Sequence, residues 1–168
     1  MIELYTDGAS SGNPGPGGYG TILRTIYQGD NPDFVGKLLE KEFLGGFRKT
    51  TNNRMELMAV IVGLEAIKKL NQQVTIYSDS KYVIDAIEKK WVYGWMSKGF
   101  VGKKNKDLWI RLMNVYKLHQ VKLVWVKGHA GHPLNERCDQ LAVKASKDKA
   151  NWKIDSVFET TELQNQGL

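Results

Sequence analysis

Four acidic residues occupy positions from which their carboxylates could converge on one site. Asp7 follows a strand-like run, Glu56 lies in the first turn of a predicted helix, and Asp139 lies in the last predicted helix. Asp79 stands at a strand-to-helix junction, and open α/β sheets gather ligands at the carboxyl ends of their strands. Phosphoryl transfer to water by two divalent ions about 4 Å apart needs several carboxylates, because Mg2+ takes oxygen ligands. The four acids are sufficient for such a site.

Each of these acids also has an explanation that involves no chemistry. Glu56 stands three residues after Asn53, which is the spacing of a capping box at the start of a helix. Asp79 suits the cap of the helix that follows it, and Asp139 flanks an apolar helical stripe, where solvated acids are common. Asp7 precedes a glycine and suits a turn. Considered one at a time, the acids leave the site undecided.

A glycine-rich segment at residues 15–20 matches the dinucleotide-binding pattern G-x-G-x-x-G. That pattern requires a helix to follow, because the helix N-terminus binds the pyrophosphate. Here the strand-like residues 21–23 follow, so we reject nucleotide binding. We expect the glycines to permit a tight chain reversal and a close approach of a ligand to the backbone.

Two histidines, His129 and His132, lie close together but have no further zinc ligands of suitable spacing nearby. His129 is in a glycine-flanked loop, where a histidine suits proton transfer near neutral pH. The alternative is an ordinary surface histidine in a polar loop. The residues alone leave both interpretations open.

The excess positive charge of the chain lies in one segment. The 168 residues include 24 basic and 18 acidic ones, which gives a net charge of +6, and residues 89–106 contain six lysines and no acid. The same segment holds Trp91, Tyr93, Trp95 and Phe100. Lysines displace condensed counterions from a nucleic-acid backbone, while aromatic rings pack on sugars or bases. The segment therefore indicates nucleic-acid binding, against the alternative of a solvated loop with a few aromatic anchors.

Composition argues against several other classes of protein. The single cysteine, Cys138, cannot form an internal disulfide or a thiolate metal site, so redox chemistry is not expected. No apolar run approaches the ~20 residues of a membrane span, and the first residues show no signal-peptide pattern. We therefore expect a cytoplasmic protein that does not associate with membranes and binds no cofactor besides metal.

Hydrophobic periodicity and turn residues predict one α/β domain. Alternation predicts a first strand over residues 2–6 that ends at Asp7, followed by a glycine-rich loop over residues 8–20. Two more strands complete an antiparallel meander, and crossover units follow. Residues 151–168 are a polar tail with no predicted structure. The remaining predicted elements are strands at 21–27, 38–47, 74–78 and 121–126 and helices at 53–70, 80–87, 108–116 and 134–147.

Read together, five segments resemble ribonuclease H of type 1, the bacterial ribonuclease HI family. The resemblance spans residues 2–147 and implies a ribonuclease H-like α/β fold, a five-stranded mixed sheet with its first three strands antiparallel and helices on both faces. It implies a catalytic domain over residues 1–150, in which 89–106 form a basic protrusion, and a tail over 151–168. Because a strand begins at residue 2, no N-terminal hybrid-binding domain is expected. The segments are TDGASSGNPGPGGYG from Thr6, TTNNRMEL from Thr50, YSDSKYV from Tyr77, KKNKDLW from Lys103 and VKGHAGHPLNERCDQLA from Val126.

The resemblance implies a monomeric endoribonuclease that cleaves the RNA strand of RNA/DNA hybrids without strong sequence specificity. Catalysis would use two Mg2+ ions, for which Mn2+ substitutes, and would leave 5'-phosphate and 3'-hydroxyl ends. The family's catalytic and metal-binding carboxylates fall on Asp7, Glu56, Asp79 and Asp139, and its mobile-loop histidine falls on His129. Two alternatives stay open: a non-catalytic module that binds hybrids or double-stranded RNA, and another metal nuclease of the superfamily.

The resemblance also implies residues that bind the hybrid. Asn52 and Asn53 resemble a pair that reads the minor groove, where amides donate to and accept from 2'-hydroxyls. Thr51 and Asn105 resemble part of a pocket that grips a DNA phosphate, and the protrusion resembles one that lines the DNA strand. Residues 28–41 are longer than in the family and have no assigned function. The expected binding residues are Asn13, Thr51, Asn52, Asn53, Lys90, Trp91, Trp95, Lys98, Lys103, Lys104 and Asn105.

Overall fold

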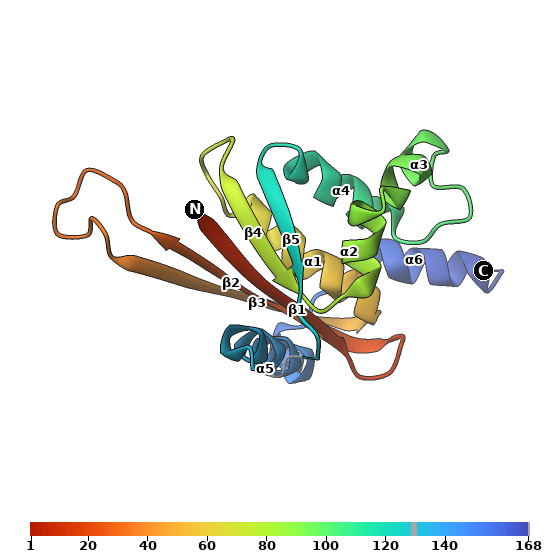
Figure 1. The fold of residues 1–168 in the computed structure, drawn as a ribbon. Helices are drawn as coiled ribbons and strands as arrows, with labels where there is room; N and C mark the ends of the chain where they lie inside the picture. Colours follow the sequence, from red (N-terminus) through yellow and green to blue (C-terminus); the bar gives the residue numbers. More distant parts are fainter. Residues whose placement is uncertain (129–130, 168) are drawn as a thin grey trace.

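The computed structural model describes residues 1–128 and 131–167, and its centre is a sheet in the order β3-β2-β1-β4-β5 (Figure 1). β1, β2 and β3 pair in antiparallel fashion, whereas β4 runs parallel to β1 and β5 parallel to β4. The predicted five-stranded mixed sheet is therefore confirmed. The strands are β1 (Ile2–Ser10), β2 (Gly15–Ile26), β3 (Leu38–Thr50), β4 (Gln73–Ser78) and β5 (Gln120–Trp125). The α-helices are α1 (Asn52–Glu65), α2 (Lys81–Glu88), α3 (Trp91–Ser97), α4 (Lys106–Tyr116), α5 (Pro133–Lys147) and α6 (Ser156–Asn165).

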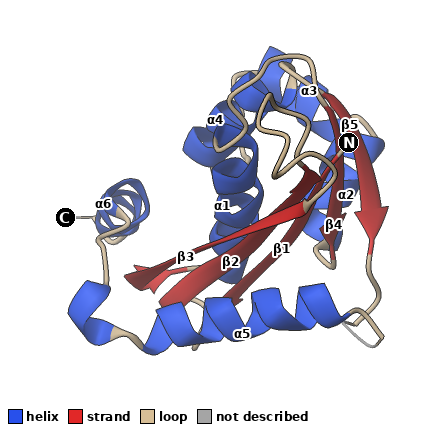
Figure 2. Cartoon of the chain, turned by 90° about the vertical axis from the view of Figure 1, so that its left-hand side faces the viewer, coloured by secondary structure: helices blue, strands red, loops and turns tan. Residues whose placement is uncertain are grey.

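Helices cover both faces of the sheet, as the resemblance implied (Figure 2). α1 packs on β1 and β2 from one side, and α5 packs on β1, β2 and β3 from the other. The main apolar core lies on the α1 side, where Leu4 and Ile76 of the sheet join Leu57 of α1 and Trp109 of α4, all fully buried. Burial of these side chains fixes α1 and α4 against the strands that carry the acidic residues.

The first two strands are longer than predicted. β1 continues through Asp7 to Ser10, and β2 begins at Gly15, inside the segment predicted to be a loop. Asp7 pairs with Gly20 in the ladder between these strands. The glycine is needed for helix packing, because a Cβ on Gly20 would lie 2.4 Å from the carbonyl oxygen of Cys138 in α5. Packing of a helix on the sheet thus overrides the local turn propensity of the segment.

The helices also differ from the predicted ones. α1 begins after Thr51, whose hydroxyl accepts a hydrogen bond from the Arg54 backbone at 3.2 Å, and not after Asn53. It ends at Glu65, before the predicted residue 70. α3 and α6 were not predicted, because α3 buries only Val92 and α6, which is described in full, buries no residue. A helix without a buried face gives little periodic signal. None of the described helices is long and apolar enough to cross a membrane.

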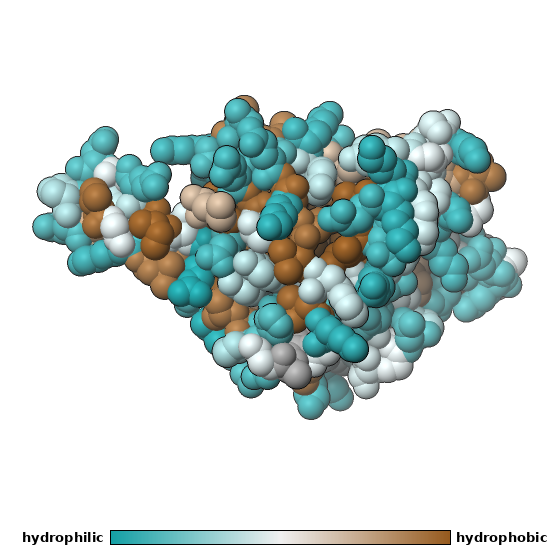
Figure 3. All heavy atoms as spheres, in the orientation of Figure 1, coloured by the Kyte–Doolittle hydropathy of each residue, from teal (hydrophilic) through white to brown (hydrophobic). Residues whose placement is uncertain are grey.

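Residues 28–41 belong to a hairpin in which β2 and β3 extend beyond the rest of the sheet (Figure 1). Tyr27 and Phe34 meet edge to face near its tip, with ring centroids 6.0 Å apart. Phe34 and Val35 are nevertheless 46% and 58% exposed, and hydrophobic residues are visible on the projecting hairpin in Figure 3. The hairpin lengthens β2 and β3 without adding to the apolar core.

Candidate active site

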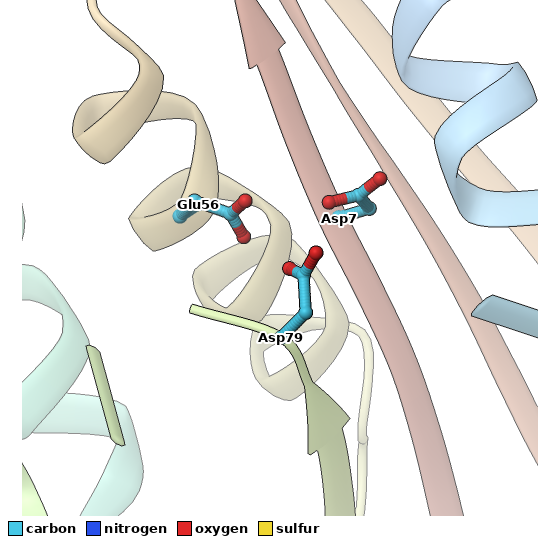
Figure 4. A group of neighbouring side chains, drawn as sticks. All are labelled: Asp7, Glu56 and Asp79. Atoms are coloured by element: carbon cyan, nitrogen blue, oxygen red, sulfur yellow. The ribbon is translucent and has the colours of Figure 1, made fainter. Parts of the chain in front are cut away.

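Three of the four predicted acids form one cluster. Asp7 lies on β1, Glu56 on α1 and Asp79 directly after β4. Each offers a carboxylate oxygen, and these oxygens lie within 4.8 Å of one another. Figure 4 shows the three side chains directed toward a common centre. Residues that are 72 positions apart in the sequence, Asp7 and Asp79, are thus brought together by the fold.

Strand pairing and a glycine bring the three carboxylates together. β1 and β4 are parallel neighbours, and Tyr5 lies opposite Tyr77. Asp7 comes two residues after Tyr5 and Asp79 two residues after Tyr77, so the pairing brings the two acids side by side. Gly8 permits the third contact, since a Cβ there would lie 2.4 Å from the backbone nitrogen of Glu56. Only glycine lets α1 approach β1 this closely, and this approach places Glu56 beside Asp7.

The structure excludes the capping explanations for two of the acids. Thr51 caps α1, and the residue three positions later is Arg54, so Glu56 is not part of a capping box. Ser80 caps α2, because its hydroxyl accepts a hydrogen bond from the Val83 backbone at 3.2 Å. Asp79 therefore does not cap that helix. The two carboxylates are directed into the cluster instead (Figure 4).

The cluster concentrates negative charge away from water. Asp7 and Glu56 are only 2% and 4% exposed. Burial, followed by the negative charges of Asp79 and Asp139, raises the pKa of Asp7 to about 8. Burial, followed by the charges of Asp7 and Asp79, raises the pKa of Glu56 well above its usual range. Without a compensating cation, burial and mutual repulsion therefore favour the protonated forms of these carboxyls.

A hard divalent cation fits this donor set. All three side chains offer oxygen ligands of the kind that Mg2+ prefers. Glu56 Oε2 is buried and has no hydrogen-bond partner among residues 1–128 and 131–167. A bound cation would satisfy this oxygen and offset the mutual repulsion that raises the carboxyl pKa values. The arrangement thus supports metal binding by Asp7, Glu56 and Asp79.

Asp139 borders the cluster from the other face of the sheet. It lies on α5, which packs against β1 and β2, and it is half-buried. Its carboxyl is close enough to raise the pKa of Asp7 by a hydrogen bond and by its charge. It does not belong to the group of three whose oxygens lie within 4.8 Å. His129, the fifth predicted site residue, lies outside the described residues.

Part of the predicted binding set lines a single cavity of about 900 Å3. The amide of Asn13 accepts a hydrogen bond from the backbone of Asn52 at 3.1 Å, which joins the loop before β2 to the start of α1. Asn52 itself does not line the cavity. The predicted residues that do line it are Asn13, Thr51, Asn53, Lys103, Lys104 and Asn105.

Apart from Asn52 on α1, the other predicted binding residues lie on or beside α3. Trp91 is 48% exposed, and the Lys89 ammonium lies 5.1 Å from its ring centre. Trp95 is half-buried and meets Trp109 edge to face at 5.9 Å, while the Lys103 ammonium lies 5.2 Å from the Trp95 ring. Lys90 and Lys98 flank α3 and are exposed. Lysines of the segment thus lie near the rings of Trp91 and Trp95, whereas Phe100 is buried in the apolar core.

Sequence reasoning missed a buried charge network behind the cavity. Arg54 is 3% exposed and forms paired hydrogen bonds with Asp107, at 2.9 and 2.7 Å, and with Asp155, at 2.7 and 2.9 Å. It thereby joins α1 to the start of α4 and to the residue before α6. Arg54 stands within TTNNRMEL, but its two partners lie more than 50 positions away, so only the fold reveals them.

Comparisons with known proteins give a consistent result. The family model described as RNase H matches residues 1–147. A ribonuclease H of Lachnoclostridium phytofermentans is 53% identical over 164 residues, which cover 94% of this chain and 99% of that protein. A ribonuclease H of Desulforamulus reducens is 54% identical over 151 residues, or 87% of each chain. The crystal structure of LC9-RNase H1, a type 1 RNase H with the type 2 active-site motif, superimposes with a TM-score of 0.72 at 32% identity, covering 86% of this chain and 71% of that one.

Proposed function

Because this chain belongs to the ribonuclease H family, and is thus a ribonuclease, we propose that it cleaves the RNA strand of RNA/DNA hybrids internally. One observation supports this most directly: the carboxylate oxygens of Asp7, Glu56 and Asp79 lie within 4.8 Å of one another on three separate elements. Such a concentration of oxygen ligands suits metal-assisted hydrolysis of a phosphodiester, in which a bound divalent ion would stabilise the developing charge. We propose that the enzyme acts as a monomer in the cytoplasm.

In the proposed mechanism, Asp7, Glu56 and Asp79 would hold Mg2+, for which Mn2+ would substitute, and Asp139 would complete the carboxylate set from α5. Two bound ions would supply an activated water and stabilise the departing 3'-oxygen, which leaves 5'-phosphate and 3'-hydroxyl ends. The low exposure of Asp7 and Glu56 keeps bulk water from solvating their charges. His129 follows β5 in sequence and is proposed to move a proton during cleavage or product release.

Recognition in this proposal depends on sugars and phosphates, so it requires no base sequence. Asn52 and Asn53 open α1, one helical turn before Glu56, where their amides would contact 2'-hydroxyls of the RNA strand. Thr51, Asn105 and the lysines around the cavity would contact phosphates of the DNA strand. Because phosphates and sugars are the same at every step, cleavage is proposed to show no strong sequence preference.

The direct test is cleavage of an end-labelled RNA strand presented alone, paired with RNA and paired with DNA. We expect internal cleavage of the RNA in the hybrid with Mg2+, and no cleavage in EDTA. Shortening from one end only would indicate an exonuclease of the superfamily. Tight binding of the hybrid without cleavage, in both Mg2+ and Mn2+, would support a binding module and contradict the proposal.

The lysines beside the cavity should determine much of the salt dependence of binding. Each lysine that neutralises a phosphate contributes about 0.9 to the slope of log Kd against log salt concentration on B-form DNA. Replacing Lys103, Lys104 and Lys106 by Gln should therefore lower that slope by about two to three and weaken binding at ~0.1 M salt by more than 100-fold. Fluorescence anisotropy with a labelled hybrid at several salt concentrations measures both values.

A matched control separates local contacts from the change in net charge. Lys68, Lys69 and Lys122 are exposed lysines away from the cavity, and replacing them by Gln removes the same total charge. This control should leave the slope nearly unchanged. Equal slopes for the two triple variants would contradict the assignment of residues 103–106 to the DNA strand.

A further inference from the structure

The cavity that holds the predicted phosphate contacts has a wall formed by the C-terminal helix. One side is formed by the start of α1 and the loop before β2, and a second by residues 103–107 and α4. α6 forms the remaining side, and Figure 2 shows it standing beside α1 as a separate rod. The cavity residues contributed by α6 are Val157, Phe158, Thr161, Glu162 and Asn165.

α6 is held in this position by charged contacts to the body of the protein. Asp155, which precedes the helix, accepts hydrogen bonds from Thr50 at 2.7 Å and from Arg54 at 2.7 and 2.9 Å. Farther along, Glu159 pairs with Arg48 at 3.0 Å. Glu162 pairs with Lys49. The helix therefore has a defined place although it buries none of its own residues.

The same contacts reduce the electrostatic repulsion between an acidic helix and the phosphates of a nucleic acid. The two glutamates of the first two turns of α6 are neutralised by Arg48 and Lys49 of β3. What the helix adds to the cavity is an apolar surface from Val157 and half-buried Phe158, together with the hydroxyl of Thr161. This surface can pack against a sugar without repelling the phosphates beside it.

The opposite wall has the complementary character. Lys103, Lys104 and Lys106 line it, and in the part of the chain that the structure describes none of them takes part in an ion pair. The remaining acid of this wall, Asp107, is bound to Arg54. Among the described residues, the cavity thus has lysines without ion pairs on one side. On the other side it has the apolar Val157 and Phe158 next to Thr161, Asn165 and Glu162, whose charge is paired with Lys49. A sugar-phosphate chain is complementary to these two walls, because its phosphates are anionic and its sugars present carbon atoms.

We propose that α6 is a wall of the nucleic-acid groove and contacts the DNA strand of the bound hybrid, with Phe158 packing against a deoxyribose. This inference rests on the proposed function, because it places the DNA strand where the lysines and Asn105 would grip its phosphates. A deoxyribose suits the apolar part of this wall, formed by Val157 and Phe158, because the 2'-hydroxyl of a ribose would meet carbon atoms there. α6 would therefore favour a DNA strand over an RNA strand in the cavity.

Two neighbouring threonines of α6 allow a gain-of-contact test. Both are exposed, but Thr161 lines the cavity and Thr160 does not. In an Asp7→Asn background that prevents cleavage, Thr161→Lys should steepen the slope of log Kd against log salt by about 0.9 and strengthen hybrid binding about five- to tenfold at ~0.1 M salt. Thr160→Lys adds the same charge one residue away on another face of the helix, and should change the slope little.

A second pair of variants tests the apolar contact. Phe158→Ser should weaken hybrid binding about fivefold, the low end of the range for aromatic contacts to nucleic acids, with a smaller effect on double-stranded RNA. Leu163→Ser, on the same helix but outside the cavity, is the control. Circular dichroism confirms that each variant keeps its helices.

The outcomes separate failure of this inference from failure of the proposed function. If the protein with intact carboxylates cleaves the hybrid but Thr161→Lys and Thr160→Lys give equal slopes, α6 does not contact the DNA strand and the inference is wrong. Tighter binding by Phe158→Ser would show that α6 obstructs the groove, and would overturn it as well. If the protein neither cleaves nor binds the hybrid, the proposed function fails and the inference fails with it.

Discussion

Replacing Asp7 by Asn is expected to lower hybrid cleavage by at least about 10^3-fold while leaving hybrid binding intact. The amide keeps the size of the side chain but removes the charge that would hold metal, and loss of ~4 kcal/mol of transition-state stabilisation corresponds to that factor. Single-turnover cleavage of a labelled hybrid measures the rate, and anisotropy measures the affinity. Asp30→Asn, an exposed acid on the β2–β3 hairpin, is the matched control and should retain full activity.

The same substitution should stabilise the protein in the absence of metal. The pKa of Asp7 is raised from 3.8 to about 8 in the folded state, first by burial and then by the charge of Asp79. A group with a raised folded-state pKa contributes stability below its unfolded pKa, and this contribution is lost as the pH rises through the folded pKa. Above pH 8 the folded protein therefore bears the cost of a buried charge, which Asn removes.

The full shift of about four pKa units would correspond to ~6 kcal/mol at most, because one unit corresponds to ~1.4 kcal/mol. We expect a gain of at least ~2 kcal/mol at pH 8, which raises Tm by roughly 4–8 °C. Thermal unfolding in EDTA, followed by circular dichroism from pH 4 to 9, measures it. The difference in Tm between Asp7→Asn and the unsubstituted protein should be small near pH 4 and grow toward pH 8. If the difference in Tm is absent or independent of pH, ionisation of Asp7 does not destabilise the folded protein, and the prediction is wrong.

The sheet could be predicted from the sequence because its signals are local, whereas the site acids were assigned only through the resemblance of five separated segments to one family. Alternating apolar residues identify the strands, but the position of Asp79 between a strand and a helix fits a helix cap as well as a site residue. The extent of β1 and β2 could not be predicted in this way. Gly8 and Gly20 read as turn residues, yet each lies in a strand where a helix approaches too closely for a Cβ. Tertiary packing requires these glycines, and this requirement produces no periodic pattern in the sequence.

α6 and the Arg54 network show a second limit of sequence reasoning. A helix is recognised by a buried apolar face, and α6 is held by ion pairs to β3 instead. The charged side chains that hold it, such as Arg48 and Glu159, are 111 positions apart and look like ordinary surface residues in the sequence. The tail that sequence analysis left without structure therefore forms part of the cavity that holds half of the predicted binding residues.

Replacing Arg54 by Met is expected to cost ~3–5 kcal/mol of folding free energy, which is the usual loss when one partner of a buried ion pair is removed. Arg54 and Asp155 are 3% and 8% exposed, so the substitution leaves a carboxylate of low exposure without its cation. For a chain of this length the loss lowers Tm by roughly 6–20 °C. Thermal and urea unfolding, followed by circular dichroism, measure it.

The pH dependence of this loss follows from Asp107. Partial burial would raise the pKa of Asp107, but hydrogen bonds to Arg54 and its positive charge outweigh burial and lower it. A lowered folded-state pKa contributes stability above the unfolded value, near 3.8, and this contribution is lost as the pH falls through the folded pKa. The Arg54→Met variant lacks this contribution. Its Tm deficit should therefore be largest near neutral pH and shrink on acidification below pH 4.

A matched control is available in Arg111→Met. Arg111 also makes two hydrogen bonds to one carboxylate, that of Glu65 at 2.9 and 2.6 Å, but both side chains are more than a third exposed. Its loss should therefore cost at most ~1 kcal/mol. Adding Asp155→Asn to Arg54→Met should recover part of the larger loss, because the stranded carboxylate is neutralised. Equal losses from the two arginine variants, without recovery in the double variant, would mean that burial of the Arg54 network does not set its contribution to stability.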